Sequence, residues 1–210
     1  MSVVDRRSRR RSETVQEILD VALEVMAEEG VAALSLSEVA RRMGLRPPSL
    51  YQYFASRMAI YDSLFERGAR QELEAAQRHG DRIAGDPVAG IAAGQEAVLG
   101  WVQANPVLAQ LLHWRPVPGF EPSARAFEPA VRQLEFLRAA LRAAVDAGQL
   151  APGAASEEGV ALCTVLVSGV ISQQMSNEPS APAGQGRFIR LAPTALDMFV
   201  RYYAPKEDGS

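Results

Sequence analysis

The sequence has few of the residues that most often carry metal or redox chemistry. It holds one cysteine, Cys163, and two histidines, His79 and His113, without a recognisable spacing of metal ligands. A single cysteine excludes an internal disulfide and agrees with a reducing compartment. No glycine-rich phosphate loop and no nucleophile elbow occurs. We therefore expect no metal, no cofactor and no catalytic centre.

Long apolar runs are also missing. The longest, Val160 to Ile171, is too short to cross a bilayer and is interrupted by Thr164, Ser168 and Gly169. The basic N-terminal residues lead into an amphipathic pattern instead of an apolar run, so we expect no signal peptide. These features predict a cytoplasmic location.

Lysine is almost absent, since Lys206 is the only one, and the positive charge is carried by arginine. Together with abundant alanine, this predicts a bacterial genome rich in G and C. The net charge of -3 argues against indiscriminate coating of nucleic acid. The arginines nevertheless cluster, because five of them lie within residues 1–12. We interpret residues 1–11 either as a solvated terminus or as a flexible basic arm that adds phosphate or minor-groove contacts.

Helical periodicity runs through the 210 residues, and no strand pattern or repeat appears. About half of the chain is apolar, as in a globular protein with a sizeable core. The pattern predicts an all-α protein of about nine helices. The expected segments are the arm at 1–11, a three-helix domain at 12–56, a linking helix at 57–79, a helical body at 80–204 and a tail at 205–210.

The most informative stretch is Ser35 to Arg57. Ser35 and Glu38 form an S-x-x-E capping box that predicts a helix starting at Leu36. Gly44 is suited to end that helix, and Pro47 is suited to the first turn of the next, which we expect to reach Phe54. The pattern predicts a helix-turn-helix in which Leu50 and Phe54 are buried.

The outward residues of the second short helix favour DNA binding over a plain helical hairpin. Ser49, Tyr51, Gln52 and Tyr53 would be poorly accommodated in a core. Residues 36 to 60 contain a single acid, Glu38, and four arginines, Arg41, Arg42, Arg46 and Arg57. Such a local excess of cations suits phosphate binding. The hairpin without a DNA-binding role stays the alternative.

The stretch Gly30-x4-Ser35-x3-Val39-Ala40-x3-Gly44-Leu-x4-Leu50-Tyr51-x-Tyr53-Phe54-x2-Arg57 resembles the N-terminal DNA-binding domain of the TetR family of transcriptional regulators. The resemblance covers about residues 12 to 65. Serine at 35 stands for the usual threonine and Arg57 for the usual lysine. Arg46 occupies the place of a small capping residue, and the pair Pro47-Pro48 stiffens the entry to the reading helix.

The resemblance implies roles for individual residues. Tyr53 and Arg57 match the phosphate-contacting pair of the family, and Pro48, Ser49 and Tyr51 stand where it reads bases. By its chemistry Gln52 suits adenine, and Arg46 suits either a guanine or a phosphate. The full set that we expect at the DNA is Ser35, Ser37, Arg46, Pro47, Pro48, Ser49, Tyr51, Gln52, Tyr53 and Arg57.

The family resemblance also implies a small-molecule effector bound in the body, with the 57–79 helix transmitting its effect to the head. Aromatic walls with a few polar groups are typical of such pockets, although an aromatic side chain at helical spacing is more often plain core. The candidate ligand-binding residues are Trp101, His113, Trp114, Phe120, Phe127, Gln174 and Met175. We expect the loop 115–122 at the edge of the pocket.

A helix expected at 156–177 is apolar around its whole circumference, so it needs cover on every side. In a chain of this size a second copy can cover one face, with the helix at 193–203 as its partner. The expected interface residues are Val167, Ile171, Leu196, Phe199 and Val200. The sequence thus predicts a homodimeric regulator, more often a repressor in this family, that binds a palindromic operator in double-stranded DNA. An activator, or a helical ligand-binding protein or enzyme with an incidental hairpin, is the alternative.

Overall fold

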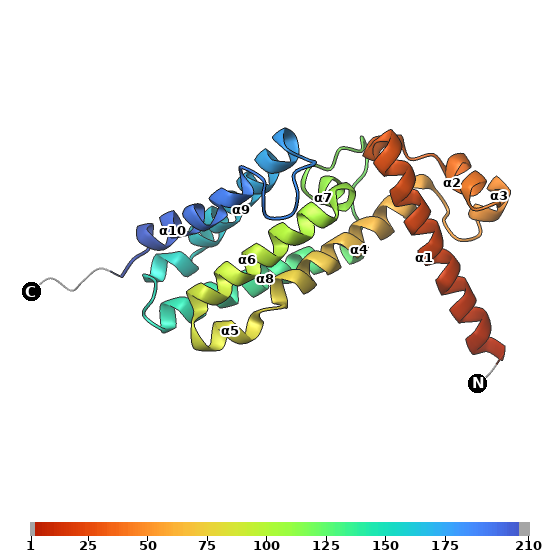
Figure 1. The fold of residues 1–210 in the computed structure, drawn as a ribbon. Coiled ribbons are helices and arrows are strands. Elements are labelled where there is room, and N and C mark those ends of the chain that lie inside the picture. The colour runs from red at the N-terminus through yellow and green to blue at the C-terminus, as the bar shows by residue number, and fades with distance from the viewer. Residues whose placement is uncertain (1–2, 206–210) are drawn as a thin grey trace, which may run out of the picture. The chain divides into compact units, whose positions relative to one another are not determined.

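Helices make up the regular secondary structure of the chain (Figure 1). The computed structural model describes residues 3–205, with side chains from residue 8 onward. Within that range no strand occurs, and the all-α prediction is confirmed. The α-helices are α1 (Val3–Glu29), α2 (Leu36–Arg42), α3 (Pro47–Leu50), α4 (Arg57–Gln77), α5 (Gly80–Gly85), α6 (Pro87–Ala104), α7 (Pro106–His113), α8 (Ala124–Asp146), α9 (Glu157–Asn177) and α10 (Ala192–Tyr202). Three short 3-10 helices are η1 (Val31–Ala33), η2 (Pro152–Ala155) and η3 (Ile189–Leu191).

The first helix begins earlier than the sequence pattern predicts. We expected a start near Ser12, whereas α1 begins at Val3. Arginine and glutamate favour helix, and Arg9 pairs with Glu13 one turn later (Nε–Oε1 3.0 Å). The described part of the expected arm is therefore helical, and residues 1–2 lie outside the described residues. The helix ends at Glu29, and Gly30 follows with a φ of +96°.

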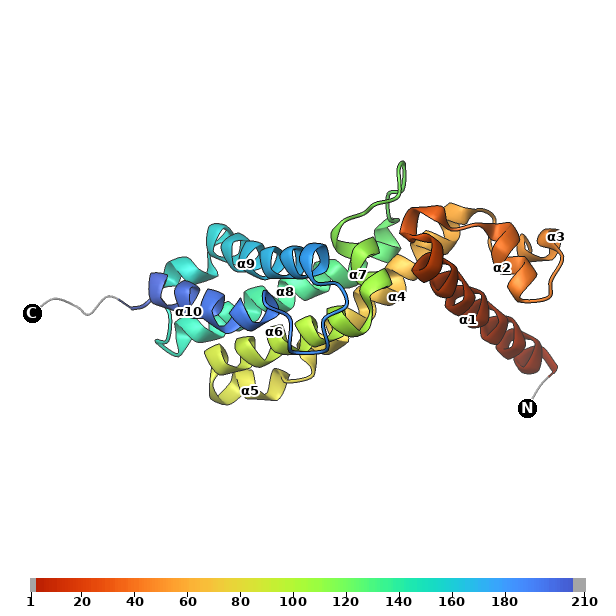
Figure 2. The ribbon, with the colours of Figure 1, turned by 45° about the horizontal axis from the view of Figure 1, so that its top comes forward.

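The sequence analysis did not predict the short helix α5, whose residues lie at the start of the expected body. Apart from Ile83 it offers little apolar pattern, and it begins and ends with glycine. Its stability comes from α6, beside which it lies (Figure 2). A Cβ built on Gly90 of α6 would approach Ile83 to 2.6 Å, so only glycine allows this close packing.

Close packing divides the chain into two units. Unit 1 holds the described residues up to Gly68 together with Val107–Phe127, and unit 2 holds Ala69–Pro106 and the described residues from Glu128. These units cut through α4 and α8, whereas our expected boundaries followed the order of the sequence. The division into head, linking helix and body stays a prediction about function. Of the expected tail, only Pro205 is described.

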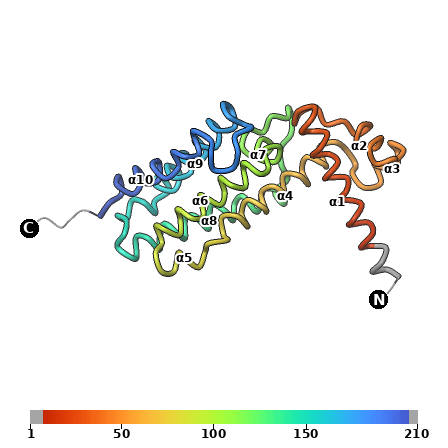
Figure 3. The backbone as a smooth tube through the Cα atoms, in the orientation of Figure 1, coloured from red at the N-terminus to blue at the C-terminus, as the bar shows by residue number. Residues whose placement is uncertain are grey.

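The core of unit 1 joins α1, α2 and α3, which follow one another in Figure 3, to the first half of α4. Ile18 and Val25 of α1 are fully buried, as are Leu50 of α3 and Tyr61 of α4. The Tyr61 hydroxyl donates to the Val31 carbonyl (2.6 Å). This bond satisfies a buried polar group and fixes α4 against the end of α1.

Segment 107–127 completes unit 1 from far along the sequence. The ring of Phe120 lies 5.7 Å from that of Tyr61 and 6.2 Å from that of Phe65. Asp62 accepts two hydrogen bonds from Ser123, from its backbone N–H (2.7 Å) and its hydroxyl (2.8 Å). We had assigned this segment to the body, because its contacts with α4 leave no signal in the local sequence.

The core of unit 2 is formed by α6, α8, α9 and α10. Leu141, Val160, Cys163 and Phe199 belong to one buried cluster. Figures 1 and 2 both show α9 and α10 side by side. One face of α9 therefore packs inside its own unit.

Candidate nucleic-acid interface

Only one of the two hydrogen bonds of the predicted capping box forms at the start of α2. The Ser35 hydroxyl accepts a hydrogen bond from the Glu38 backbone N–H (3.4 Å), so α2 begins at Leu36. The second half of the expected capping box differs. The Glu38 carboxylate turns to Arg41 (2.8 and 2.7 Å) and to Arg42 (2.8 Å).

The turn between α2 and α3 follows the prediction. Gly44 has φ +66°, the left-handed conformation that ends a helix at low cost. The Leu45 N–H then bonds back to the Ala40 carbonyl (2.9 Å), which satisfies an end group of α2. Pro47 and Pro48 open α3, where their missing N–H groups are not needed.

The second helix of the pair is shorter than predicted. We expected it to reach Phe54, but α3 ends at Leu50 and residues 51–53 continue as turns. The Gln52 N–H bonds to the Ser49 carbonyl (3.3 Å) and the Tyr53 N–H to the Leu50 carbonyl (2.9 Å). We call residues 46–53 the reading segment.

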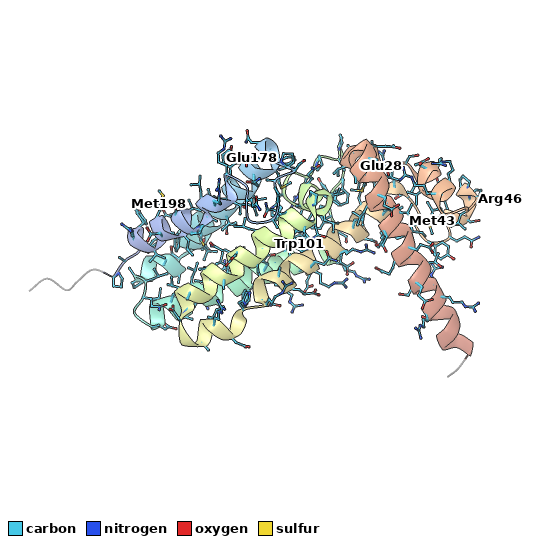
Figure 4. The ribbon with its side chains drawn as sticks, in the orientation of Figure 1. Glu28, Met43, Arg46, Trp101, Glu178 and Met198 are labelled. Atoms are coloured by element: carbon cyan, nitrogen blue, oxygen red, sulfur yellow. The ribbon has the colours of Figure 1, made fainter. Side chains whose placement is uncertain are left out.

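The reading segment has the expected two sides. Leu50 and Phe54 are buried, while Tyr51 is 55% exposed. Arg46, which is labelled in Figure 4, directly precedes α3. The predicted DNA-binding residues fall into an exposed group, Ser37, Arg46, Pro47, Pro48, Tyr51, Gln52 and Arg57, and a half-buried group, Ser35, Ser49 and Tyr53.

Two of the four arginines that we counted as a local excess of charge are neutralised. Arg42 bonds both Glu38 and Glu28 of α1, and Arg41 bonds Glu38. Hydrogen bonds from Arg41 and Arg42 lower the pKa of Glu38 to about 2. The sequence count missed Glu28, because this acid comes from another helix. Arg46 and Arg57 are both exposed, and among the described residues neither forms an ion pair.

Arg11 is a further residue at this face that the sequence analysis did not single out. It comes from α1, within the expected arm. Its Nη2 donates to the Gln52 carbonyl (2.9 Å), and its guanidinium lies 5.1 Å from the centre of the Tyr53 ring. The periodicity of α1 gives no signal for this contact, because the two partners are far apart in sequence.

The seven predicted ligand-binding residues do not form one cluster in either unit. His113, Trp114, Phe120 and Phe127 belong to unit 1, and the other three to unit 2. Phe120 and Phe127 both contact Phe65, the latter stacked at 6.0 Å. The guanidinium of Arg115, a residue with φ +46°, lies over Phe65 and Phe127 (5.8 and 5.4 Å). This arrangement is an aromatic core closed by a cation.

Two of the three predicted ligand residues in unit 2 have polar partners of their own. The Trp101 Nε1–H donates to Gln71 (3.3 Å). Gln174 is buried; its amide donates to the Glu178 carbonyl (2.7 Å) and accepts from the N–H groups of residues 188 and 189 (3.3 Å each). Gln174 therefore holds the loop that follows α9. The first residue of this loop, Glu178, is labelled in Figure 4.

Unit 2 contains a narrow hollow between α6, α9 and α10. Ten residues line it, including Gln95, Cys163 and Phe199, and none of the seven predicted ligand-binding residues is among them. The Gln95 amide donates to Cys163 Sγ (3.4 Å), and burial raises the pKa of the thiol to about 11. Cys163 is thus a neutral core group at pH 7.

The predicted interface residues need correction. Ile171 and Phe199 are each 1% exposed, so they belong to the core of the chain itself. Val167, Leu196 and Val200 are half-buried. The exposed apolar residues nearby are Val165 (64%) on α9, and Leu191, Met198 and Tyr202 on η3 and α10. Figure 4 shows Met198 on the outer side of α10.

By length and composition alone, α9 is able to cross a membrane, although we had judged its apolar run too short. The core helix of a soluble protein meets the same criteria. Its exposed side carries Thr164, Ser168 and Gly169 beside Val165. Hydroxyls and a glycine on that side fit contact with another helix better than contact with lipid alone.

Comparison with known proteins agrees with the geometry of the head. Residues 18–64 match the bacterial regulatory proteins of the tetR family. The HTH-type transcriptional regulator Rv1816 of Mycobacterium tuberculosis is 27% identical over 149 residues, which are 70% of this chain and 64% of that protein. The chain thus matches slightly less than two thirds of this relative.

Two solved structures share the fold. SmeT, the repressor of the Stenotrophomonas maltophilia multidrug efflux pump SmeDEF, has a TM-score of 0.70 at 22% identity, with 93% of each chain covered. FadR of Bacillus subtilis, in complex with stearoyl-CoA, has a TM-score of 0.68 at 19% identity, with 88% of this chain and 97% of FadR covered. At these identities the likeness concerns the fold.

Proposed function

We propose that this chain, whose residues 18–64 match the tetR family of bacterial regulatory proteins, is a sequence-specific DNA-binding transcriptional regulator, a repressor released by a small-molecule effector. The observation that carries the proposal is the two-sided reading segment. Leu50 and Phe54 anchor it in the core, while Tyr51 and Gln52 face solvent. A helical pair built only for packing has no need of such an exposed polar and aromatic face.

At the DNA, the side chains divide by chemistry. Arg46 and Arg57 carry charge that no described acid neutralises, and the Tyr53 hydroxyl suits a phosphate oxygen. Pro48 and Tyr51 are exposed and Ser49 is half-buried, and in this proposal the three contact base edges or thymine methyl groups. Gln52 pairs with adenine through its amide, and Ser35 and Ser37 lie at the start of α2, where free N–H groups suit a phosphate.

One short reading segment touches few base pairs, so specific binding requires two heads about 34–36 Å apart. We place the two-fold contact on the exposed sides of α9 and α10, with Val165, Leu191, Met198 and Tyr202 at its centre. The small residues beside Val165 allow a partner helix to approach closely. This interface replaces Ile171 and Phe199, which the core of the chain already uses, and keeps the half-buried Val167, Leu196 and Val200 at its border.

The effector belongs to the body of the protein in this proposal. FadR of Bacillus subtilis, which shares the fold, was crystallised with stearoyl-CoA. Trp101 and Met175 remain the candidate ligand contacts in unit 2, while His113, Trp114, Phe120 and Phe127 remain candidates in unit 1. Gln174 is already engaged in holding a loop. An effector that releases DNA must bind the DNA-incompetent conformer more tightly, and α4 transmits the change.

The proposed location is the cytoplasm, where the operator is. In the proposed dimer α9 is covered by a second copy, so its length and composition require no membrane. Catalysis plays no part in this function.

Selection from a random duplex library, repeated over a range of salt concentrations, tests the proposal. We expect an enriched palindrome with half-sites one helical turn apart and steep salt dependence. Binding that is equally strong on every duplex would contradict sequence-specific regulation. It would leave the helix pair as a structural hairpin of a protein with another task. The enriched operator then serves as a reporter in a search for releasing ligands.

A further inference from the structure

The end of the reading segment has little helical support of its own. Because α3 stops at Leu50, residues Gln52 and Tyr53 lie in turns: each N–H makes one i to i+3 bond, and a single helical bond, from the Phe54 N–H to the Leu50 carbonyl (3.1 Å), spans both residues. Bonds of the i to i+3 kind have poorer geometry than those of an α-helix. A side chain from elsewhere that contacts these residues therefore has a large share in fixing where they point.

Arg11 is such a side chain. It donates to the Gln52 carbonyl (2.9 Å), and the same guanidinium lies over the Tyr53 ring, 5.1 Å from its centre. Two successive residues of the reading segment are thus held by one group. The helix that carries Arg11 is itself fixed, since Ile18 and Ala22 of α1 are fully buried.

Its neighbours on α1 differ. Arg9 pairs with Glu13, and Arg10 is exposed, with no contact of its side chain recorded among the described residues. The planar guanidinium of arginine can stack on a ring while it donates to a carbonyl in its own plane, which the point-like ammonium of lysine cannot do. The contact of Arg11 is therefore specific to this residue and not a general effect of basic charge.

We infer that Arg11 is a positioning residue that sets the sequence preference of the reading segment by holding Gln52 and Tyr53 in place. The inference rests on the proposed function, because the sequence preference exists only if the protein reads DNA. It differs from a role for the basic residues of α1 as phosphate contacts. A phosphate contact would strengthen binding to all duplexes alike, whereas a positioning residue changes the ratio between the operator and other sequences.

The test compares Arg11→Ala and Arg11→Lys with Arg10→Ala, which removes the same charge from the same turn of α1. Each variant of the full chain is measured on the selected operator and on a random duplex. We define the discrimination as the Kd for the random duplex divided by the Kd for the operator. For Arg11→Ala we expect this ratio to fall about tenfold, which is the discrimination that one good base contact provides. For Arg10→Ala we expect both affinities to weaken alike, with the ratio unchanged. Arg11→Lys keeps the charge and still loses discrimination.

Hydrogen exchange in the absence of DNA provides the second readout. Amides at residues 52–54 should exchange faster in Arg11→Ala than in the wild-type protein, and at the wild-type rate in Arg10→Ala. If Arg11→Ala kept both the wild-type ratio and the wild-type exchange, the inference would be wrong while the proposed function stood. If the wild-type protein itself did not prefer any operator, the proposed function would fail first. In that case, faster exchange in Arg11→Ala would mean that Arg11 only stabilises the local structure.

Discussion

Arg42 of α2 holds Glu28 of α1 with two parallel hydrogen bonds, from Nη1 to Oε1 (2.9 Å) and from Nη2 to Oε2 (2.6 Å). Its Nε donates to Glu38 (2.8 Å), so one guanidinium joins two helices and two acids. Bidentate pairs of this kind fix geometry as well as charge. Arg42 is thereby engaged within the head, and the charge offered to DNA comes from other arginines.

The stability of the head should fall in acid because of this network. The pKa of Glu38 is lowered from 4.5 to about 2 by its hydrogen bonds to Arg41 and Arg42. A carboxylate with a lowered folded-state pKa stabilises in full above its unfolded pKa and loses its contribution as the pH falls through the folded value. We therefore expect the free energy of unfolding to decrease between pH about 4.5 and about 2. Glu38→Gln should flatten the profile in this range, as followed by urea unfolding.

Glu24→Gln is the control for that experiment. Glu24 is exposed on α1 and forms no recorded ion pair within the described residues. The acid-dependent loss of stability should persist in this variant. An unchanged profile in Glu38→Gln would assign the acid sensitivity to other groups.

Ser35→Ala should destabilise the head by about 1 kcal/mol, the usual cost of a lost helix cap. The hydroxyl of Ser35 accepts from the Glu38 N–H, and alanine leaves that donor without its partner. Ser35→Thr should restore most of the loss, whereas Ser37→Ala, at an exposed site inside α2, should have little effect. Chemical denaturation without DNA measures the differences, and equal losses at both serines would refute the capping role.

Phosphate contacts and base contacts should separate in binding experiments. Arg57→Ala and Tyr53→Phe should weaken binding to the operator and to random duplexes alike, and Arg57→Ala should lower the salt slope by about 1. Gln52→Ala should cost about 1–3 kcal/mol on the operator and far less on other sequences. Titrations at several salt concentrations provide both numbers. Uniform losses for all three variants would contradict base reading by Gln52.

Gly169 offers a test of the proposed dimer that spares the fold of the single chain. A Cβ at Gly169 on α9 or at Gly100 on α6 would meet no atom within 4 Å, so both helices accept a side chain there. Gly169→Trp should block the close approach of a second α9 and weaken dimerisation, whereas Gly100→Trp should leave it intact. Sedimentation equilibrium measures the two dissociation constants. Wild-type dimerisation in Gly169→Trp would move the interface elsewhere.

Phe120→Ala should destabilise unit 1 by about 3 kcal/mol, because it removes a buried ring from the Tyr61 and Phe65 cluster. Phe127→Ala removes a ring that stacks on the same Phe65 but is 36% exposed, so its cost should be clearly smaller. Hydrogen exchange at α4, together with thermal unfolding, reports the difference. Similar losses of stability in both variants would mean that the burial of a ring does not determine the cost of removing it.

Local rules predicted most of the helices. The cap at Ser35, the left-handed Gly44 and the prolines that open α3 each depend on neighbours within a few residues, so the sequence displays them. The start of α1 and the existence of α5 were not predicted. The first has no apolar stripe, and the second depends on packing against Gly90.

The candidate site was predicted in part for the same reason. Which side of the reading segment faces solvent follows from Leu50 and Phe54, which are close in sequence. The contacts of Glu28 with Arg42 and of Arg11 with Gln52 join residues that are distant along the chain, and no spacing rule indicates them. The burial of Ile171 was missed because the apolar circumference of α9 does not tell which side meets its own core. The burial of Phe199 was missed because we expected α10 to face the partner copy, whereas this ring lies in the core of its own chain.

Segment 107–127 is made by the ribosome long after α4, yet it supplies the Phe120 ring that packs on Tyr61 and Phe65 in unit 1. A nascent chain that ends at Gly68 therefore exposes the aromatic side of α4, and the head reaches its final form only once Phe120 and Ser123 have been translated. A fragment that stops at the end of α4 would lack Phe120 and Ser123, and with them these contacts of the head. The proposed DNA-binding head is therefore complete only after residue 123 has been translated.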